Sequence, residues 1–119
     1  GEYLVVDYKA TAKKDEVNLD ADWQISYKRQ MEIYQWLLRK NGLPISNRGW
    51  FVYCNGKRDL NRFDNKVEFR VSLLPYDGND DWVETALIEA KETLNRGDLP
   101  PPDENCDFCT YRQETAVFE

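Results

Sequence analysis

The sequence predicts an α/β (α+β) fold in which a small mixed sheet is flanked by helices, in the order strand, helix, strand, strand, helix. Short apolar runs at residues 3–9 and 48–54 are typical of buried strands. A helical period lies between them, at residues 22–40. Because a long helix separates the first two strands, we expect them to pair in parallel through a right-handed connection. Residues 66–74 alternate apolar and polar side chains, which favours a half-exposed strand antiparallel to the one before it.

The helix at residues 22–40 has the most regular pattern in the chain. Asp20 or Asp22 is expected to cap its start, because a short carboxylate can accept hydrogen bonds from the first turn. Gly42 stands where a left-handed residue commonly ends a helix, and Pro44 follows it. Apolar and aromatic residues recur at spacings of three or four and predict the buried stripe: Trp23, Tyr27, Met31, Tyr34 and Leu38.

A second helix is expected to begin at Asp80 or Asp81 and to end before Gly97. Beyond it the chain is rich in proline and leads to two cysteines spaced as Cys-x-x-Cys. We therefore expect two regions, a core over residues 1–98 and a Pro-rich tail over residues 99–119.

Composition excludes several classes of function. The chain has 119 residues, of which 41% are hydrophobic, and this is enough for one compact domain. The absence of His removes Ser-His-Asp, Cys-His and His-ligated zinc chemistry. The net charge of −6 argues against nucleic-acid binding through bulk charge, but a nuclease can gather its basic contacts locally. No apolar run has membrane length, so we expect no membrane partner and take a cytoplasmic location as the default.

An acid and a base stand two positions apart at the end of the first strand. Side chains alternate faces along a strand, so Asp7 and Lys9 must point the same way. A carboxylate can hold a divalent metal, and an ammonium can stabilise an oxyanion. The alternative is a structural ion pair. On the helix, Gln30 and Tyr34 share a face, and packing gives no reason for an amide beside the apolar stripe. If the helix lies beside the first strand, all four residues are neighbours.

These residues resemble the second and third motifs of the RecB-like branch of the PD-(D/E)XK nuclease superfamily. The resemblance rests on Val5-Val6-Asp7-Tyr8-Lys9 followed by Gln30-x-x-x-Tyr34, and the Pro-rich run into Cys106-x-x-Cys109 adds to it. It covers residues 2–111 and implies a partial restriction-endonuclease-like core. The activity it implies is Mg²⁺- or Mn²⁺-dependent hydrolysis of DNA phosphodiesters, in repair, recombination or CRISPR adaptation.

The resemblance also implies a role for each matching residue. Asp7 is expected to bind the metal, with the backbone carbonyl of Tyr8 as a second ligand. Lys9 is expected to orient the attacking water or to stabilise charge on the phosphate. Gln30 and Tyr34 are expected to position substrate or to brace Lys9.

Two departures from the family pattern carry expectations of their own. The first acidic motif is absent, and one carboxylate holds Mg²⁺ poorly. We therefore expect this chain to be weak or inactive as a nuclease, or to be a non-catalytic module that binds DNA or docks proteins. Iron–sulfur members carry more cysteines than are found here. Cys106 and Cys109 are thus interpreted as a remnant thiolate pair, with no iron–sulfur cluster or zinc expected.

The expected partners follow from the same resemblance. DNA is the main one, and Lys28 and Arg29 are candidates for phosphate contacts, with a solvated helix face as the alternative. A helicase or other domains of a longer parent chain are further candidates. The strand at residues 2–9 is expected to have an open edge, and such an edge predicts self-association.

Overall fold

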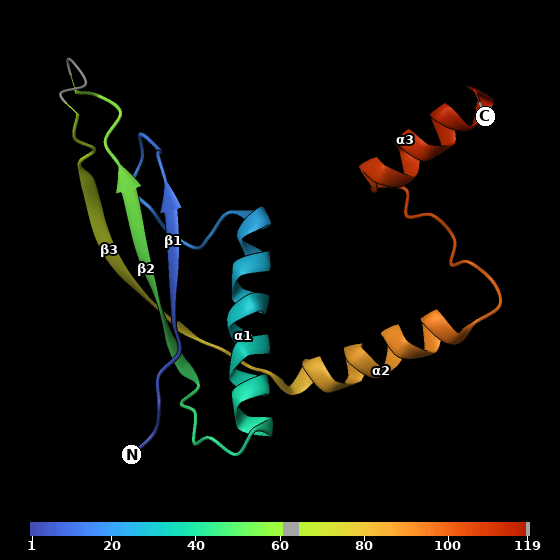
Figure 1. Ribbon diagram of the computed structural model, residues 1–119, viewed down its shortest axis with the longest axis horizontal. Coiled ribbons are helices and arrows are strands. Elements are labelled where there is room, and N and C mark those ends of the chain that lie inside the picture. The colour runs from blue at the N-terminus through green and yellow to red at the C-terminus, as the bar shows by residue number, and fades with distance from the viewer. Residues whose placement is uncertain (61–64, 119) are drawn as a thin grey trace. The chain divides into compact units, whose positions relative to one another are not determined.

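The computed structural model describes residues 1–60 and 65–118, apart from the side chain of Trp23 (Figure 1). Part of the connection expected between the second and third strands, and the Trp23 position of the predicted stripe, lie outside the described residues. The elements are β1 (Val6–Thr11), the 3-10 turn η1 (Asp22–Gln24), α1 (Ile25–Lys40), β2 (Arg48–Gly56), β3 (Phe69–Asp77), α2 (Asp81–Asn95), α3 (Asp107–Thr115) and the 3-10 turn η2 (Ala116–Phe118). The mixed α/β class is confirmed, and so is the predicted order strand, helix, strand, strand, helix, which corresponds to β1, α1, β2, β3 and α2.

The sheet has the order β1-β2-β3, with β2 in the centre. β1 runs parallel to β2, and β3 is antiparallel to β2, as the sequence predicts. The bounds of the first strand were predicted wrongly, because β1 begins at Val6 and not at residue 2 or 3. Before Val6 the chain follows the loop after α1: the N–H of Tyr3 donates to the carbonyl of Pro44 at 2.7 Å, and Tyr3 forms an isolated bridge with Ile45.

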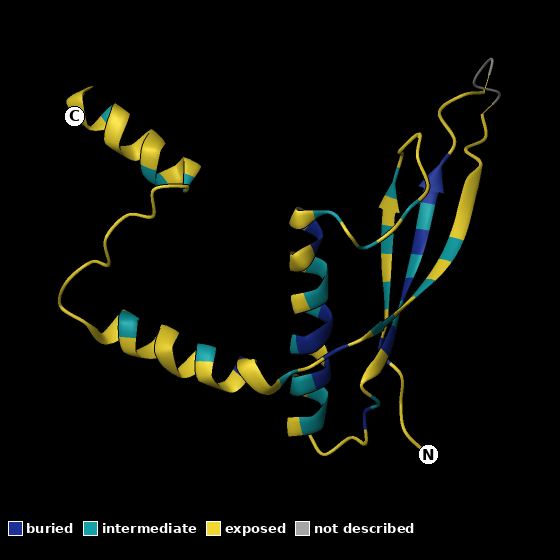
Figure 2. Cartoon of the chain, turned by 180° about the vertical axis from the view of Figure 1, so that it is seen from behind, coloured by how far each residue is buried: buried dark blue, intermediate teal, exposed yellow. Residues whose placement is uncertain are grey.

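α1 lies against one face of the sheet, and the core forms between them (Figures 1 and 2). Met31 on α1 and Phe51 on β2 are fully buried, and Val5 and Ile45 complete the buried cluster. The helix comes close to β2 at Gly49, where an added Cβ would lie 2.5 Å from the sulfur of Met31. Glycine at this position is therefore what lets the long Met31 side chain reach the strand.

The opposite side of the sheet is apolar, with exposed residues on β1 and β3 and half-buried ones on β2, and we call it the outer sheet face. Val71 and Leu73 were expected to form the apolar side of their strand, but they are 59% and 62% exposed. Leu74 and Tyr76 pack on the core instead. The reason is the register between β2 and β3. Leu73 pairs with Val52, and Val52 points away from α1 because its neighbours along β2 point toward α1. No element within residues 1–60 and 65–84 covers this face, which consists of Val6, Tyr8, Trp50, Val52, Val71 and Leu73.

α1 ends as predicted. Gly42 has a φ of +84°, and its N–H donates to the carbonyl of Arg39 at 2.9 Å. The N–H of Leu43 donates to the carbonyl of Leu38 at 3.1 Å, which completes a Schellman motif.

The start of α1 differs from the prediction. Gln24, and neither Asp20 nor Asp22, occupies the N-cap position, and its side chain makes no capping hydrogen bond. Instead its Oε1 accepts from the N–H of Ala21 at 2.9 Å, so that this buried amide closes the turn before the helix. The carboxylates remain exposed because the 3-10 turn η1 separates them from the first α-helical turn.

The chain divides into two compact units, residues 1–84 and 85–119. The predicted division at residue 98 stays a prediction. Within the second unit, α3 follows the prolines, and Cys106 is its N-cap. Among the described helices none combines the length and the apolar character that crossing a membrane requires.

Candidate functional site

β1 directs the acid–base pair toward α1. Asp7 pairs in register with Phe51, and Lys9 pairs with Tyr53. Residues opposite each other in neighbouring strands share a face, and the buried Phe51 packs on Met31 of α1, so the two charged side chains face the helix as well. They lie at the rim of this interface, where the side chains of Asp7 and Lys9 keep 16% and 14% of their exposure.

The structure brings together the four residues of the two sequence motifs. Lys9 Nζ lies 2.6 Å from Oδ2 of Asp7 and donates to Oε1 of Gln30 at 2.5 Å. Gln30 Nε2 donates in turn to the hydroxyl of Tyr34 at 2.9 Å. Because Gln30 and Tyr34 are spaced i, i+4 on α1, their side chains form a chain of hydrogen bonds that runs from Tyr34 at the helix surface to the Lys9 ammonium on β1.

An amide suits position 30 because it both accepts and donates. Its oxygen accepts from the Lys9 ammonium while its nitrogen donates to Tyr34, so each end of Gln30 is matched to its partner. The ammonium also lies 4.4 Å from the ring centroid of Tyr27, within range of a cation–π contact. We expected Tyr27 only as a core residue, and its position one helical turn before Gln30 was the signal that could have indicated the contact.

One carboxylate oxygen of Asp7 can still accept a hydrogen bond or bind a cation. Oδ2 is buried and faces Lys9 as an ion pair, but it accepts no well-formed hydrogen bond from the described residues. The Trp50 N–H donates to the carbonyl of Val5, so alternation along β1 turns the Tyr8 carbonyl toward the opposite edge of the strand. No described strand pairs with that edge. Asp7 and Tyr8 therefore offer two oxygen ligands, and the Lys9 ammonium, 2.6 Å from Oδ2, competes with a cation for the Asp7 oxygen.

These two oxygens can be compared with what a hard divalent cation needs. Mg²⁺ prefers oxygen ligands, keeps several waters and is often held by one or two carboxylates. Within residues 1–60 and 65–118, no group of three or more His, Cys, Asp or Glu side chains is arranged to hold a metal ion. The donors fit a hydrated magnesium or manganese ion, but they are too few for tight binding.

The remaining candidates lie apart from this group. Lys28 Nζ lies 5.9 Å from the ring centroid of Tyr76, and the guanidinium of Arg29 lies 6.0 Å from the ring of Trp82. Both cations therefore stand over aromatic rings of the β3–α2 region, on a different side of α1 from Gln30.

The two tail cysteines form a local pair at the start of α3. The N–H of Cys109 donates to Sγ of Cys106 at 3.4 Å. Hydrogen bonds from Cys109 lower the pKa of the Cys106 thiol, and the contact with Cys106 raises the pKa of the Cys109 thiol. Cys54 lies on β2 and belongs to the other compact unit, so within the described residues the pair has no third thiol from its own unit.

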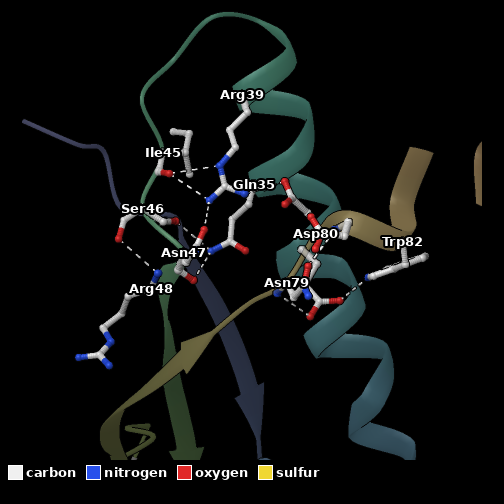
Figure 3. Close-up of polar contacts among 11 residues, drawn as sticks. Gln35, Arg39, Ile45, Ser46, Asn47, Arg48, Asn79, Asp80 and Trp82 are labelled. Atoms are coloured by element: carbon white, nitrogen blue, oxygen red, sulfur yellow. Dashed lines mark hydrogen bonds and ion pairs between the residues drawn. The ribbon is translucent and has the colours of Figure 1, made fainter. Parts of the chain in front are cut away.

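A buried polar network holds α1 in place, and the sequence analysis missed it (Figure 3). The carboxylate of Glu32 accepts from the Tyr76 hydroxyl at 2.7 Å and from Trp82 Nε1 at 2.7 Å. It also accepts from the backbone N–H of Asn79 at 3.2 Å. Burial, together with the hydrogen bond to Glu32 and its charge, raises the pKa of Tyr76 to about 12.

Two further side chains of α1 belong to this network. Gln35 Nε2 donates to the carbonyls of Ser46 and Asn47 at 3.2 and 2.8 Å. Arg39 donates to the carbonyl of Ile45 at 3.0 Å and to the carboxylate of Asp80 at 2.6 Å. The signal was available: Glu32, Gln35 and Arg39 recur at spacings of three and four, as the apolar stripe does. By fixing the helix on the sheet, they also fix Gln30 relative to Lys9.

Comparison with protein-family models gives a match to the PD-(D/E)XK nuclease superfamily over residues 1–113. A search of curated proteins and a search of solved structures found no match. The matched range contains the four residues of the β1–α1 site and both tail cysteines.

Proposed function

This chain belongs to the PD-(D/E)XK nuclease superfamily, which gives it a nuclease-type function, and from this premise we propose that it is the catalytic part of a RecB-like DNA nuclease. The observation that carries the proposal is the contact chain from Asp7 through Lys9 and Gln30 to Tyr34. Nucleases of this kind act in DNA repair, recombination or CRISPR adaptation, and the substrate would be a DNA phosphodiester.

Each residue has a distinct role in this proposal. Asp7 Oδ2 and the Tyr8 carbonyl hold Mg²⁺ or Mn²⁺, which supplies an acidified water and charge neutralisation when bound. Lys9 directs its ammonium toward the phosphate, where a fixed positive charge stabilises the transition state. Gln30 fixes Nζ of Lys9, and Tyr34 fixes the amide of Gln30. Water is partly excluded because the Asp7 and Lys9 side chains are largely buried.

We further propose that residues 1–119 alone bind the metal weakly and cut slowly. The described residues supply one carboxylate at this site, and the Lys9 ammonium already neutralises part of its charge at 2.6 Å. A second carboxylate added to the site would raise both affinity and rate.

The same ion pair favours a second candidate function. A carboxylate held by a neighbouring ammonium can be purely structural, and the chain would then be a non-catalytic nuclease-fold module that binds DNA or docks proteins. The two candidates differ in two measurable properties, which are whether a divalent cation binds at Asp7 and whether the chain then cleaves DNA.

Calorimetric titration with Mn²⁺ tests the proposal. We expect weak binding by the wild-type chain, loss of binding in Asp7→Asn, and unchanged binding in Asp98→Asn, which removes an exposed carboxylate elsewhere. Lys9→Met should bind Mn²⁺ more tightly, because the competing ammonium is gone, but should lose DNA cleavage. Binding that is equal in the wild type and in Asp7→Asn would overturn the metal site. Mn²⁺ binding at Asp7 with no cleavage of single- or double-stranded DNA would favour the non-catalytic module.

We also propose that two copies of the chain pair through the open edge of β1, which spans Val6–Thr11 and not the residues 2–9 expected from the sequence. The outward edge of β1 is unpaired by any described strand, and it borders the exposed Val6 and Tyr8 of the outer sheet face. Sedimentation at high concentration should give a dimer for the wild type and a monomer for Val6→Lys. A wild-type monomer at all concentrations would contradict this pairing.

A further inference from the structure

A hollow of about 520 Å³ lies beyond the ends of β1 and β2. Its walls come from the loop after β1, from the end of β2 with the segment that follows it, and from β3. Five of the eight lining residues are cations and one is an acid, on a chain whose net charge is −6. The lining residues are Lys13, Lys14, Asn55, Gly56, Lys57, Arg58, Asp59 and Arg70.

The hollow is held in shape by specific hydrogen bonds. Asn55 is buried, its Oδ1 accepts from the N–H of Lys13 at 2.8 Å, and its Nδ2 donates to the carbonyl of Lys13 at 3.1 Å. Arg58 donates to the carbonyl of Ala12 at 3.2 Å. The loop after β1 is thereby tied to the end of β2, although the tie brings like charges together. An anion in the hollow would relieve that repulsion.

Two of the lining residues, Asn55 and Arg70, stand on the same face of the sheet as the Asp7–Lys9 pair. Arg70 pairs with Asn55, and Asn55 pairs with Thr11, so these side chains share one face. Thr11 follows Lys9 by two positions, which places both on that face as well. Along the strand, Asp7 and Thr11 are about 13 Å apart at a rise of about 3.3 Å per residue. The cations therefore continue the surface that carries the β1–α1 site.

We propose that this hollow binds phosphodiester groups of the nucleic-acid backbone. The distance between this hollow and the cleaved phosphate, given next, rests on the proposed nuclease function, whereas phosphate binding in the hollow does not. Phosphates follow one another at about 3.4 Å of helix axis along each DNA strand, so 13 Å corresponds to about four nucleotides. The hollow therefore holds the strand about four nucleotides from the phosphate at Asp7.

The composition of the lining favours the backbone over a free nucleotide. None of the eight lining residues is aromatic, so a base would find no stacking surface there. Contacts to phosphate carry no sequence information, and this hollow accordingly positions the strand without reading it. Lys57 also pairs with Glu68 at 2.6 Å, but both side chains are about half exposed, and such a pair exchanges readily for a phosphate.

The test is DNA binding without metal, measured by fluorescence anisotropy in EDTA as a function of salt. The variant is Lys14→Gln with Arg70→Gln, two exposed cations of the lining. The matched control is Lys91→Gln with Arg96→Gln, which changes the net charge equally but lies on and just after α2. Two lost phosphate contacts should lower the slope of log K against log salt by about 1.8 on a duplex. Between about 50 and 200 mM salt, wild-type affinity should then fall about tenfold more than that of the variant.

Three results would overturn the proposal. The first is a salt slope that is equal in the wild type and in the Lys14 and Arg70 double variant, provided that circular dichroism finds both folded. The second is an equal loss of slope in the control. The third is a wild-type chain that binds inorganic pyrophosphate but binds no DNA in EDTA, because the ligand of the hollow would then be a free phosphate compound.

The position relative to the cut has its own readout. Neutral methylphosphonate linkages placed one at a time along a cleaved strand should weaken binding most about four nucleotides from the cut. A lower salt slope in the Lys14 and Arg70 variant without any cleavage by the wild type would remove the nuclease proposal and leave the phosphate site. Cleavage by the wild type, with a salt slope that is unchanged in the Lys14 and Arg70 variant, would remove the phosphate site and leave the nuclease proposal.

Discussion

Replacing Glu32 should cost more folding stability than replacing any of the exposed carboxylates of the chain. Its side chain is buried, with the residue 8% exposed, and it accepts from Tyr76, Asn79 and Trp82. These three donors come from the end of β3, from the following loop and from the first turn of α2. The carboxylate therefore joins α1 to a segment more than forty positions further along the chain.

The size of the effect follows from what is left behind. Glu32→Ala strands three donors, two of them side chains, and removing one partner of a buried charged network costs about 3–5 kcal/mol. Glu32→Gln keeps one carbonyl oxygen for Tyr76 and the Asn79 N–H, which both use Oε1. Its new amide group faces the indole N–H of Trp82, so two donors meet, and we expect a loss of about 1–2 kcal/mol.

A double-mutant cycle isolates the Trp82 contact. The free energy of unfolding would be measured by urea titration with far-ultraviolet circular dichroism for the wild type, Glu32→Gln, Trp82→Phe and the double variant. Phenylalanine removes the indole donor, so Glu32→Gln should cost about 1 kcal/mol less in that background. Additivity of the two changes within about 0.3 kcal/mol would refute this reasoning, as would an Ala variant as stable as the Gln variant.

Two other residues of the first compact unit give sharp predictions. Tyr76 has a pKa raised to about 12 from 10.0, so the protonated form is favoured in the folded state. Its contribution to stability is complete below about pH 10 and is lost as the pH rises toward 12. We expect this loss of folding stability to be about 1 kcal/mol, which is less than the roughly 2.7 kcal/mol that the full pKa difference would give, because the ring is partly exposed. The urea midpoint of Tyr76→Phe should therefore fall less than that of the wild type over this pH range. Gly42→Ala should lower the free energy of unfolding by about 1 kcal/mol, measured by heat or urea, because φ is +84° at this position. Gly97→Ala, whose added Cβ would meet no atom within 4 Å, should be neutral or slightly stabilising. Equal effects of the two substitutions would contradict the strain argument.

The sequence was sufficient for the elements whose signals are local. The helical period and Gly42 placed the body and the C-terminal end of α1 correctly, whereas its N-cap is Gln24 and Tyr34 of the predicted buried stripe is 38% exposed. The long connection through α1 made parallel pairing of β1 and β2 the expected result. The contact between Lys9 and Gln30 also followed, because a strand with period two and a helix with period 3.6 place both side chains on facing surfaces.

The face of β3 could not be predicted because both of its faces carry apolar residues. Alternation over residues 66–74 pointed to Val71 and Leu73, but Leu74 and Tyr76 are the ones that reach the core. The choice depends on register with β2, where the buried Phe51 already faces α1, and register is not a local property of β3.

The polar parts of the structure were missed for a related reason. A single Glu32 on a helix is indistinguishable in sequence from a solvated carboxylate, because its donors lie far along the chain. The cationic hollow likewise combines Lys14 with Arg70, and only the pairing of three strands brings these two residues to one place. Charge counted over the whole chain, which is −6, conceals a local excess of positive charge.

The alternation of backbone groups along β1 should be visible in hydrogen exchange. The N–H groups of Asp7 and Lys9 point toward β2, whereas those of Tyr8 and Ala10 point to the open edge. Adjacent amides in one strand should therefore exchange at rates that differ by orders of magnitude, slow and fast in turn. A second strand added at this edge would slow the fast amides and erase the alternation, and a cation at the Tyr8 carbonyl would not. One exchange spectrum of β1 thus reports what occupies its edge.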